Sequence, residues 1–376
     1  MIERVWFKNF KALRDASISF ARFTVIVGPN ASGKTSVLEG LDCVARLAQE
    51  PAHSVFQGDR SPGVLRSRGA EGSMILAIDG LWGRTRSRVQ VSVRRDRGNW
   101  VFSTSATLGG NLVRFDVSKE TPADMAGGRG KLLSSVRSAV LLRLDPGRLG
   151  EPSYSADWMP RAEFDGANLA VTLAELALAS PAGLQELLTR LRAVVPAVDS
   201  MALDRVPIDK TEYVAREDSG GLYEQVHATY EGYRVKLGLR RGGQIAAYAV
   251  GGGALIALGL LTVLSRRPLP RLVMVDELER GLHPKALGEL VLQIRALMER
   301  FPDLQVIGTT HSPYLVDHFS ADEVRLTTMG DDGSVLVGKL NEHPDFERWK
   351  DEMKPGEFWS TVGEDWLRER KAPAGG

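Results

Sequence analysis

A glycine-rich segment between two apolar runs constrains this chain more than any other feature. The run "FTVIV" (23–27) precedes "GPNASGKTS" (28–36), and apolar residues then recur at helical spacing at Leu38, Leu41, Ala45 and Ala48. This pattern predicts a buried strand, a tight loop and a helix. Glycines let the backbone curl so that successive N–H groups face one anion, and the helix N-terminus adds partial positive charge. The spacing Gly-x4-Gly-Lys-Thr therefore predicts a P-loop that binds a triphosphate.

The P-loop chemistry assigns a role to each residue of the segment. Lys34 can reach the β- and γ-phosphates, so we expect it to take part in catalysis, and the Thr35 hydroxyl can bind Mg²⁺. The expected ATP-binding residues are Gly28, Pro29, Asn30, Ala31, Ser32, Gly33, Lys34, Thr35 and Ser36.

Two further apolar runs end in polar residues. Leu272 to Val275 are apolar and precede Asp276 and Glu277. We expect a buried strand, Asp276 as an Mg²⁺ ligand through water and Glu277 as the residue that polarises the attacking water. Acidic residues at strand ends are common in α/β proteins, so this pattern gains weight only from the P-loop upstream.

The segment "QVIGTTHSPYLVD" (305–317) has the same form, because a β-type run again ends in polar residues. We expect His311 to follow a strand and to sense the γ-phosphate by a hydrogen bond. The alternative is a surface or capping histidine.

Composition indicates a soluble, cytoplasmic globular protein. The chain has 376 residues, 43% of them hydrophobic, and a formal net charge of +1. The single cysteine, Cys43, fits a reducing compartment, and we expect it to be buried rather than reactive. The stretch 246–264 approaches transmembrane length, but Gly251, Gly252 and Gly253 interrupt it. We expect a buried helix there and no membrane partner.

The fold class predicted from these patterns is α/β. We expect a P-loop NTPase of ABC-ATPase type with a mixed central sheet, an antiparallel β subdomain and a small helical insertion. The expected helices include 168–179, 181–195 and 284–300, with strands between 201 and 239. The predicted divisions are 1–120 (N-terminal ATPase lobe), 121–244 (mixed insertion), 245–345 (C-terminal ATPase lobe) and 346–376 (tail).

The motifs together resemble a known family. "NFKAL", "GPNASGKTS", "VDELERGLHP" and "TTHSPYLVD" are similar to ABC-type ATPase heads of the RecF/SMC and OLD-like AAA family, as are "DGANLAVTLAEL" and "KPGEFWSTVGEDWL". The resemblance implies a homodimer that sandwiches ATP and Mg²⁺, with Gly281 to His283 as a D-loop at the dimer interface. The chain after His311 is too short for the Toprim nuclease domain of some OLD proteins.

One position departs from the family pattern. Val250 stands where the signature motif has a serine, although Gly251 and Gly252 can still offer backbone N–H groups to a nucleotide. We therefore expect slow hydrolysis. Two positions are candidates for the Q-loop: Gln57 and the stretch 145–153.

A row of arginines on one predicted strand is consistent with DNA binding but does not establish it. Arg84, Arg86, Arg88 and Arg94 share strand parity, so their side chains share one face. This face could contact DNA phosphates, or it could be an ordinary solvent-exposed strand face.

The function expected from the motifs is that of an ATPase in DNA repair or anti-phage defence that acts with a separate nuclease or toxin effector. The alternative is a nucleotide-gated scaffold with little hydrolysis and no DNA binding; a transporter ATPase fits less well because "LSGGQ" is missing.

Overall fold

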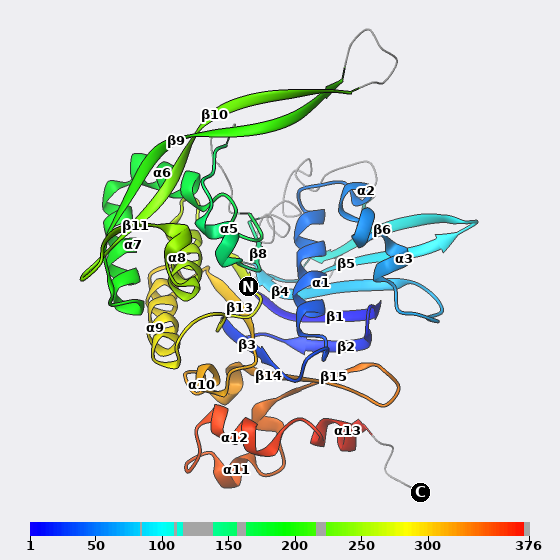
Figure 1. The fold of residues 1–376 in the computed structure, drawn as a ribbon. Helices are drawn as coiled ribbons and strands as arrows, with labels where there is room; N and C mark the ends of the chain where they lie inside the picture. The colour runs from blue at the N-terminus through cyan, green and yellow to red at the C-terminus, as the bar shows by residue number, and fades with distance from the viewer. Residues whose placement is uncertain (83–84, 109–110, 116–137, 156–162, 216–222, 372–376) are drawn as a thin grey trace, which may run out of the picture. The chain divides into compact units, whose positions relative to one another are not determined.

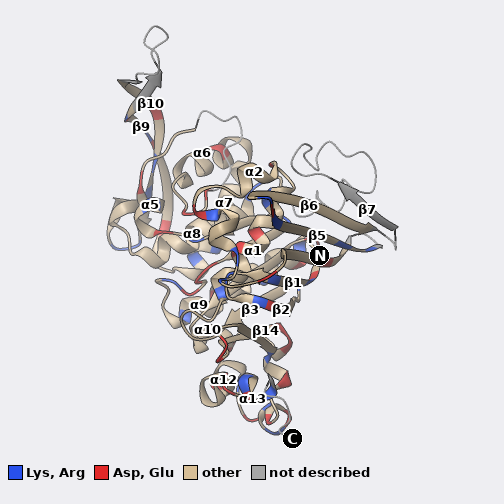
Figure 2. Ribbon diagram, turned by 90° about the vertical axis from the view of Figure 1, so that its right-hand side faces the viewer, with Lys and Arg blue, Asp and Glu red and all other residues tan. Residues whose placement is uncertain are grey.

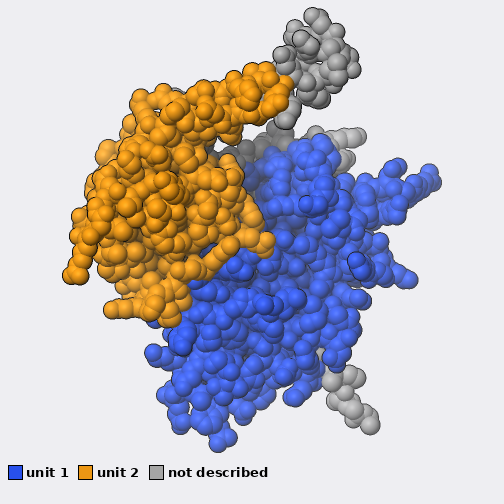
Figure 3. All heavy atoms as spheres, viewed as in Figure 1, with its two compact units in different colours: residues 1–141, 270–279, 298–376 blue, residues 142–269, 280–297 orange. Residues whose placement is uncertain are grey.

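The computed structural model describes the chain except residues 83–84, 109–110, 116–137, 156–162, 216–222 and 372–376 (Figure 1). The chain divides into two compact units, coloured in Figure 3. Unit 1 contains Met1–Leu141, Pro270–Glu279 and Met298–Gly376, and unit 2 contains Leu142–Leu269 and Arg280–Leu297.

A mixed sheet of six strands carries the motifs in unit 1. Its order is β15-β14-β3-β13-β12-β8, with bounds Val335–Lys339, Val324–Met329, Phe23–Val27, Gln305–Thr310, Leu272–Val275 and Val140–Leu142. The strands β14, β3, β13 and β12 are parallel neighbours, and β15 pairs antiparallel with β14. Strands β3, β12 and β13 are buried along their whole length, which agrees with the apolar runs of β3 and β12. Strand β13 also buries the polar residues Gln305, Thr309 and Thr310. The predicted mixed central sheet is confirmed.

The second sheet of unit 1 is antiparallel, with the order β2-β1-β4-β5-β6-β7. The strands span Leu13–Ser19, Ile2–Phe10, Met74–Trp82, Thr85–Asp96, Asn99–Leu108 and Asn111–Phe115. Helix α1 (Lys34–Leu47) packs on β1, where a Cβ on Gly40 would lie 2.3 Å from the ring of Phe7. Cys43 is buried in this core, as expected.

Three short helices lie between Pro51 and Arg66, after helix α1. They are α2 (Ala52–Val55), η1 (Gly58–Arg60) and α3 (Pro62–Leu65). Pro51 and Pro62 stand at the starts of α2 and α3, where a missing N–H costs nothing.

The segment after His311 contains both strands and helices. Besides β14 and β15 it contains α10 (Pro313–Val316), η4 (Ala321–Glu323), η5 (Leu340–Glu342), α11 (Phe346–Trp349), α12 (Pro355–Val362) and α13 (Trp366–Lys371). Strand β14 lies beside β3 and so becomes part of the central sheet. Its short apolar run gave too weak a signal to identify it.

Unit 2 combines helices with a long hairpin. The helices are α5 (Pro146–Gly150), α6 (Leu169–Ala179), α7 (Pro181–Val194), η3 (Ala247–Ala249) and α8 (Gly252–Ser265), and α9 (Pro284–Arg300) begins here. The hairpin strands β9 (Val198–Ala215) and β10 (Tyr223–Leu239) pair along their length, and β11 (Gly243–Ala246) extends that sheet.

Helix α8 is the apolar segment whose length resembled a membrane span. It is buried from Leu255 to Leu264, as expected for a core helix after a glycine turn. In the described parts of the chain, no helix combines the length and hydrophobicity needed to cross a bilayer.

Candidate functional site

The three predicted motifs meet at one edge of the central sheet. Strand β13 lies between β3 and β12, and all three run parallel. The P-loop follows β3, His311 follows β13, and Asp276 follows β12. Because parallel strands present their carboxyl ends at the same edge, residues far apart in sequence become neighbours.

The P-loop has the conformation that its glycines allow. Gly28 and Gly33 have φ values of 147° and 93°, which side chains rarely tolerate. A Cβ on Gly28 would lie 2.0 Å from the carbonyl oxygen of Thr327, and one on Gly33 would lie 2.6 Å from Val335. Strands β14 and β15 therefore press against the loop and leave no room for larger residues.

Lys34 begins helix α1 and is buried. Its Nζ donates hydrogen bonds to the carbonyl oxygens of Gly28, at 2.9 Å, and Pro29, at 2.7 Å. Burial lowers the pKa of Lys34, and the nearby carboxylates of Asp276 and then Glu279 oppose this shift. The ammonium group thus lies inside the curled loop, in the field of several acidic residues.

Thr35 and Asp276 are in direct contact. The Thr35 hydroxyl lies 3.1 and 3.2 Å from the two carboxylate oxygens of Asp276. A second hydroxyl, that of Thr309 on β13, donates to Oδ1 of Asp276 at 2.7 Å. The buried Asp276 carboxylate is therefore held beside the P-loop.

Glu277 adopts an unusual backbone conformation. Its φ is 58°, although it is not glycine, and its N–H donates to the Thr309 hydroxyl at 2.9 Å. Such left-handed residues carry a cost and cluster at functional sites. The turn exposes the Glu277 side chain next to the buried Asp276.

His311 is the first residue after β13 and is exposed. Its backbone N–H donates to Oε1 of Glu279 at 2.7 Å. The next residue, Ser312, caps helix α10 by accepting a hydrogen bond from the N–H of Leu315. His311 is therefore not the capping residue of α10, and its backbone is held by Glu279 in the turn after β12.

These residues fit ATP and Mg²⁺. The loop offers a helix N-terminus and a lysine for phosphates, and Thr35 with Asp276 offers oxygen ligands of the type that Mg²⁺ prefers. Among the described residues no group of three or more His, Cys, Asp and Glu could hold a metal alone. An Mg²⁺ ion here would need phosphate oxygens as well, as is usual for this cation.

Two family models match separate segments of the chain. A model described as "AAA ATPase domain" matches residues 1–72, and one described as "AAA domain, putative AbiEii toxin, Type IV TA system" matches residues 132–317. A solved SMC head bound to the C-winged helix domain of ScpA superposes with a TM-score of 0.59 at 15% identity. The superposition covers 92% of this chain and 99% of that one. The chain is an AAA-type ATPase head with an SMC-like fold.

Two curated relatives match this chain over short stretches. The Septu protein PtuA of Bacillus thuringiensis is 32% identical over 79 residues, which are 21% of this chain and 19% of that protein. The OLD nuclease of Thermus scotoductus (strain ATCC 700910 / SA-01) is 43% identical over 44 residues, 12% of this chain and 8% of the nuclease. The chain thus spans less than a fifth of either relative.

The signature-like turn of the ATPase head lies in unit 2. Val250 is extended, Gly251 is exposed at the N-cap of α8, and Gly252 begins that helix. A Cβ on Gly253 would lie 2.1 Å from the carbonyl oxygen of Gly281 in the D-loop segment. The two glycine turns therefore touch within one chain, and Val250 supplies no hydroxyl there.

The arginine row of the ATPase head is paired with acids. Arg86 lies 3.6 Å from Glu3, Arg88 lies 3.6 Å from Asp79, and Arg94 lies 3.8 Å from Asp96. Arg84 lies outside the described residues. Arg86, Arg88 and Arg94 share the outer face of the sheet, and Figure 2 shows both charge signs there.

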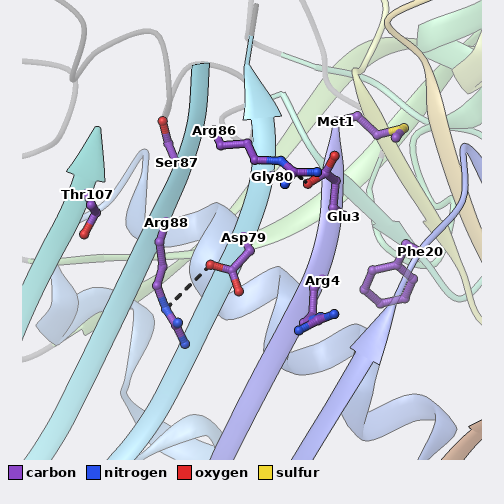
Figure 4. Close-up of a pocket in the computed structure, with 10 residues that line it drawn as sticks. All are labelled: Met1, Glu3, Arg4, Phe20, Asp79, Gly80, Arg86, Ser87, Arg88 and Thr107. Carbon is purple, nitrogen blue, oxygen red and sulfur yellow. Dashed lines mark ion pairs between the residues drawn. The ribbon is translucent and has the colours of Figure 1, made fainter. Parts of the chain in front are cut away.

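Arg86 and Arg88 line an open groove of about 690 Å³, shown in Figure 4. Arg4 also lines it, and its side chain makes no hydrogen bond or ion pair with a described residue, but Glu3 and Asp79 lie in the same groove. The mixed charge favours a solvated strand face over a strong phosphate-binding surface.

Sequence reasoning missed three residues that touch the site. Thr309 and Glu279 contact the predicted residues as described above, and the Thr327 hydroxyl lies 2.8 Å from that of Ser32. Thr309 and Glu279 lie within the quoted motifs, so their proximity to Asp276 and His311 was the available signal. Thr327 offered no signal, because it comes from the unrecognised β14.

Proposed function

We propose that the chain binds ATP with Mg²⁺ and hydrolyses it slowly. The observation that carries this proposal is the contact between Thr35, at the end of the P-loop, and Asp276, 241 residues later. A hydroxyl and a carboxylate joined in this way beside a phosphate-binding loop match the magnesium site of P-loop ATPases.

The roles follow from the chemistry of each side chain. Lys34 and the loop N–H groups would bind and orient the phosphates, and Thr35 with Asp276 would hold Mg²⁺, which supplies charge neutralisation when bound. Glu277 would accept a proton from the attacking water, since its carboxylate is exposed beside Asp276. His311 would donate to the terminal phosphate from the neighbouring strand end.

We further propose that two copies sandwich ATP between them. The SMC-like fold and the exposed Gly251 at the start of α8 support this arrangement, because backbone N–H groups at a helix start can bind an anion. Val250 lacks the hydroxyl of the usual signature serine, which supports a low hydrolysis rate.

The proposed setting is anti-phage defence or DNA repair, together with a separate nuclease or toxin effector. The short matches to the Septu protein PtuA and to the OLD nuclease support a link to such systems.

Two substitutions test the ATPase proposal. Lys34→Ala removes the phosphate-binding ammonium and should abolish ATP binding, measured by calorimetry. Glu277→Gln keeps ATP bound but stops turnover, so light scattering with saturating ATP and Mg²⁺ should find a dimer. A Glu277→Gln protein that binds ATP and stays monomeric would contradict the dimer, and ATP binding by Lys34→Ala would contradict the site.

A second candidate is a nucleotide-gated scaffold that hydrolyses little ATP and binds no DNA. The paired arginines of the outer sheet face and Val250 favour it. A gel-shift titration at two salt concentrations separates the two, since DNA binding that needs ATP and weakens steeply with salt indicates phosphate contacts. No DNA binding, with a nucleotide-dependent protein complex, would favour the scaffold.

A further inference from the structure

We propose that Glu279 is a positioning residue of the ATP site, which holds the backbone of His311 so that the imidazole can act on the terminal phosphate. The inference rests on the proposed function and deepens it. Glu279 lies three residues after Asp276, in the turn that follows β12. None of the roles described above uses its side chain.

The contact between the two turns is direct. Oε1 of Glu279 accepts the N–H of His311 at 2.7 Å, a distance typical of charge-assisted hydrogen bonds. Two other bonds join the same segments, from the N–H of Glu277 to the Thr309 hydroxyl and from the N–H of Leu278 to the Thr309 carbonyl, both at 2.9 Å. Only the Glu279 bond reaches beyond β13 to His311 itself.

The imidazole of His311 depends on this anchor. Its side chain is exposed and makes no hydrogen bond to a described residue. The bond from Ser312 N–H to the Thr310 hydroxyl, at 3.0 Å, shapes the turn but does not hold His311. The hydrogen bond from the His311 N–H to Glu279 is therefore the contact that positions the His311 backbone, from which the imidazole extends.

The second carboxylate oxygen supports a functional reason for Glu279. Its Oε2 is buried and has no hydrogen-bond partner among the described residues. A buried carboxylate oxygen without a hydrogen-bond partner lowers the stability of the fold, so such an atom calls for an explanation. If Glu279 served only to stabilise the fold, a neutral side-chain acceptor would bind the His311 N–H with a smaller desolvation penalty.

The charge of Glu279 also belongs to the phosphate site. Among the acids that raise the pKa of Lys34 against the effect of burial, Glu279 ranks second, behind Asp276 and ahead of Glu277. Its carboxylate thus lies in the electrostatic environment of the P-loop lysine, where phosphate binds in the proposed function.

Four variants test the proposal: Glu279→Ala, Glu279→Gln, His311→Ala and the double variant with alanine at both positions. Glutamine keeps a side-chain oxygen for the His311 N–H, and alanine does not. Glu323→Ala is a matched control, because Glu323 also accepts a backbone N–H, that of Ser320 at 3.0 Å, in the capping box of η4. ATP turnover and hydrogen exchange of the peptide containing His311 are measured for each protein.

Glu279→Ala should lower kcat by about 10- to 100-fold while KM for ATP changes less than about twofold, because a displaced catalytic group costs rate more than binding. The amide of His311 should exchange faster. Glu279→Gln should restore amide protection but only part of kcat, because glutamine keeps the acceptor oxygen and removes the charge, and Glu323→Ala should leave both unchanged. The double variant should be no slower than His311→Ala, because both changes disable one unit.

Three results would overturn the role of Glu279: unchanged exchange at His311 in Glu279→Ala, additive losses in the double variant, or full activity of His311→Ala. The exchange measurement needs no nucleotide, so it separates this inference from the proposed function. A protein with the expected exchange pattern and no ATP turnover would contradict the ATPase proposal alone.

Discussion

The hydroxyl of Thr309 donates to Oδ1 of Asp276 at 2.7 Å and accepts the N–H of Glu277 at 2.9 Å. One buried side chain on β13 therefore fixes both acidic residues at the end of β12. It orients the carboxylate of Asp276 and stabilises the left-handed backbone of Glu277. The neighbouring strand thus sets the geometry of the proposed magnesium site.

Thr309→Val should damage both stability and activity. Valine has a similar shape but leaves the Asp276 carboxylate and the Glu277 N–H without this partner, so we expect a loss of about 1–3 kcal/mol in the free energy of unfolding. Thr309→Ser keeps the hydroxyl and should stay within about 1 kcal/mol of the native protein. Denaturant unfolding and ATP turnover check both variants, and equal behaviour of Val and Ser would contradict this role.

Gly33→Ala should abolish ATP binding. Its φ of 93° is strained for alanine, and the new Cβ would lie 2.6 Å from Val335, so the P-loop must shift. The matched control is Gly98→Ala, since Gly98 has a φ of 91° in the turn after β5 and nothing within 4 Å of the added Cβ.

The control should cost only the left-handed backbone penalty, about 1–2 kcal/mol, and should bind ATP normally. Calorimetric ATP titration and thermal unfolding of both variants give the comparison. If Gly33→Ala binds ATP as well as Gly98→Ala does, close packing of β15 against the loop does not control the site.

The local motifs could be predicted because their geometry is encoded over a few residues. The glycines and Lys34 specify a strand, a curled loop and a helix without help from elsewhere. The convergence of Asp276 and His311 could also be predicted, because buried apolar runs before each of them indicated parallel strands whose ends meet. The α/β fold class followed from the same runs.

The remaining features depend on contacts between distant segments. The arginine row was visible, but its pairing with Asp79 and Glu3 requires the register of β4 and β1 against β5. Likewise, the need for glycine at position 28 comes from Thr327, about 300 residues later. A sequence pattern carries period and polarity but does not state which strand will become a neighbour.

Cys43 should resist alkylation in the native protein. Burial raises the pKa of its thiol to about 12, so at pH 8.5 almost none is present as the reactive thiolate. Iodoacetamide should therefore label the folded protein only through unfolding, and denaturant should make labelling rapid. Fast labelling of the native protein, read by mass spectrometry, would contradict the burial of this helix face.

Because of the same pKa shift, the free energy of unfolding should fall as the pH rises in the alkaline range. The folded state holds the Cys43 proton more tightly than the unfolded chain, whose thiol has a pKa near 9.0. Its contribution is therefore complete below pH 9 and is lost as the pH rises towards 12, at about 1.4 kcal/mol per pH unit within that window. Cys43→Ala should show a shallower decline between pH 9 and 11 in denaturant titrations, and an unchanged slope would contradict the linkage.

Asp317→Ala should loosen the C-terminal helices from the segment that carries His311. Oδ1 of Asp317, at the end of α10, accepts the N–H groups of Gly356 at 2.9 Å and Glu357 at 3.2 Å, so it caps α12 from a distance. Lys354, at the N-cap of α12, gives no side-chain cap of its own. Loss of this cap should cost about 1 kcal/mol and speed amide exchange in residues 355–362.

Asp317→Asn is the matched control, because its side-chain oxygen can accept the same N–H groups. The close approach of α10 and α12 predicts a harsher effect for Gly356→Ala, whose Cβ would lie 1.9 Å from the carbonyl oxygen of Pro313. Exchange in residues 355–362 should therefore rise in the order native, Asp317→Asn, Asp317→Ala and Gly356→Ala. If Asp317→Ala exchanges like the native protein, α12 is held by packing alone and the cap from α10 is dispensable.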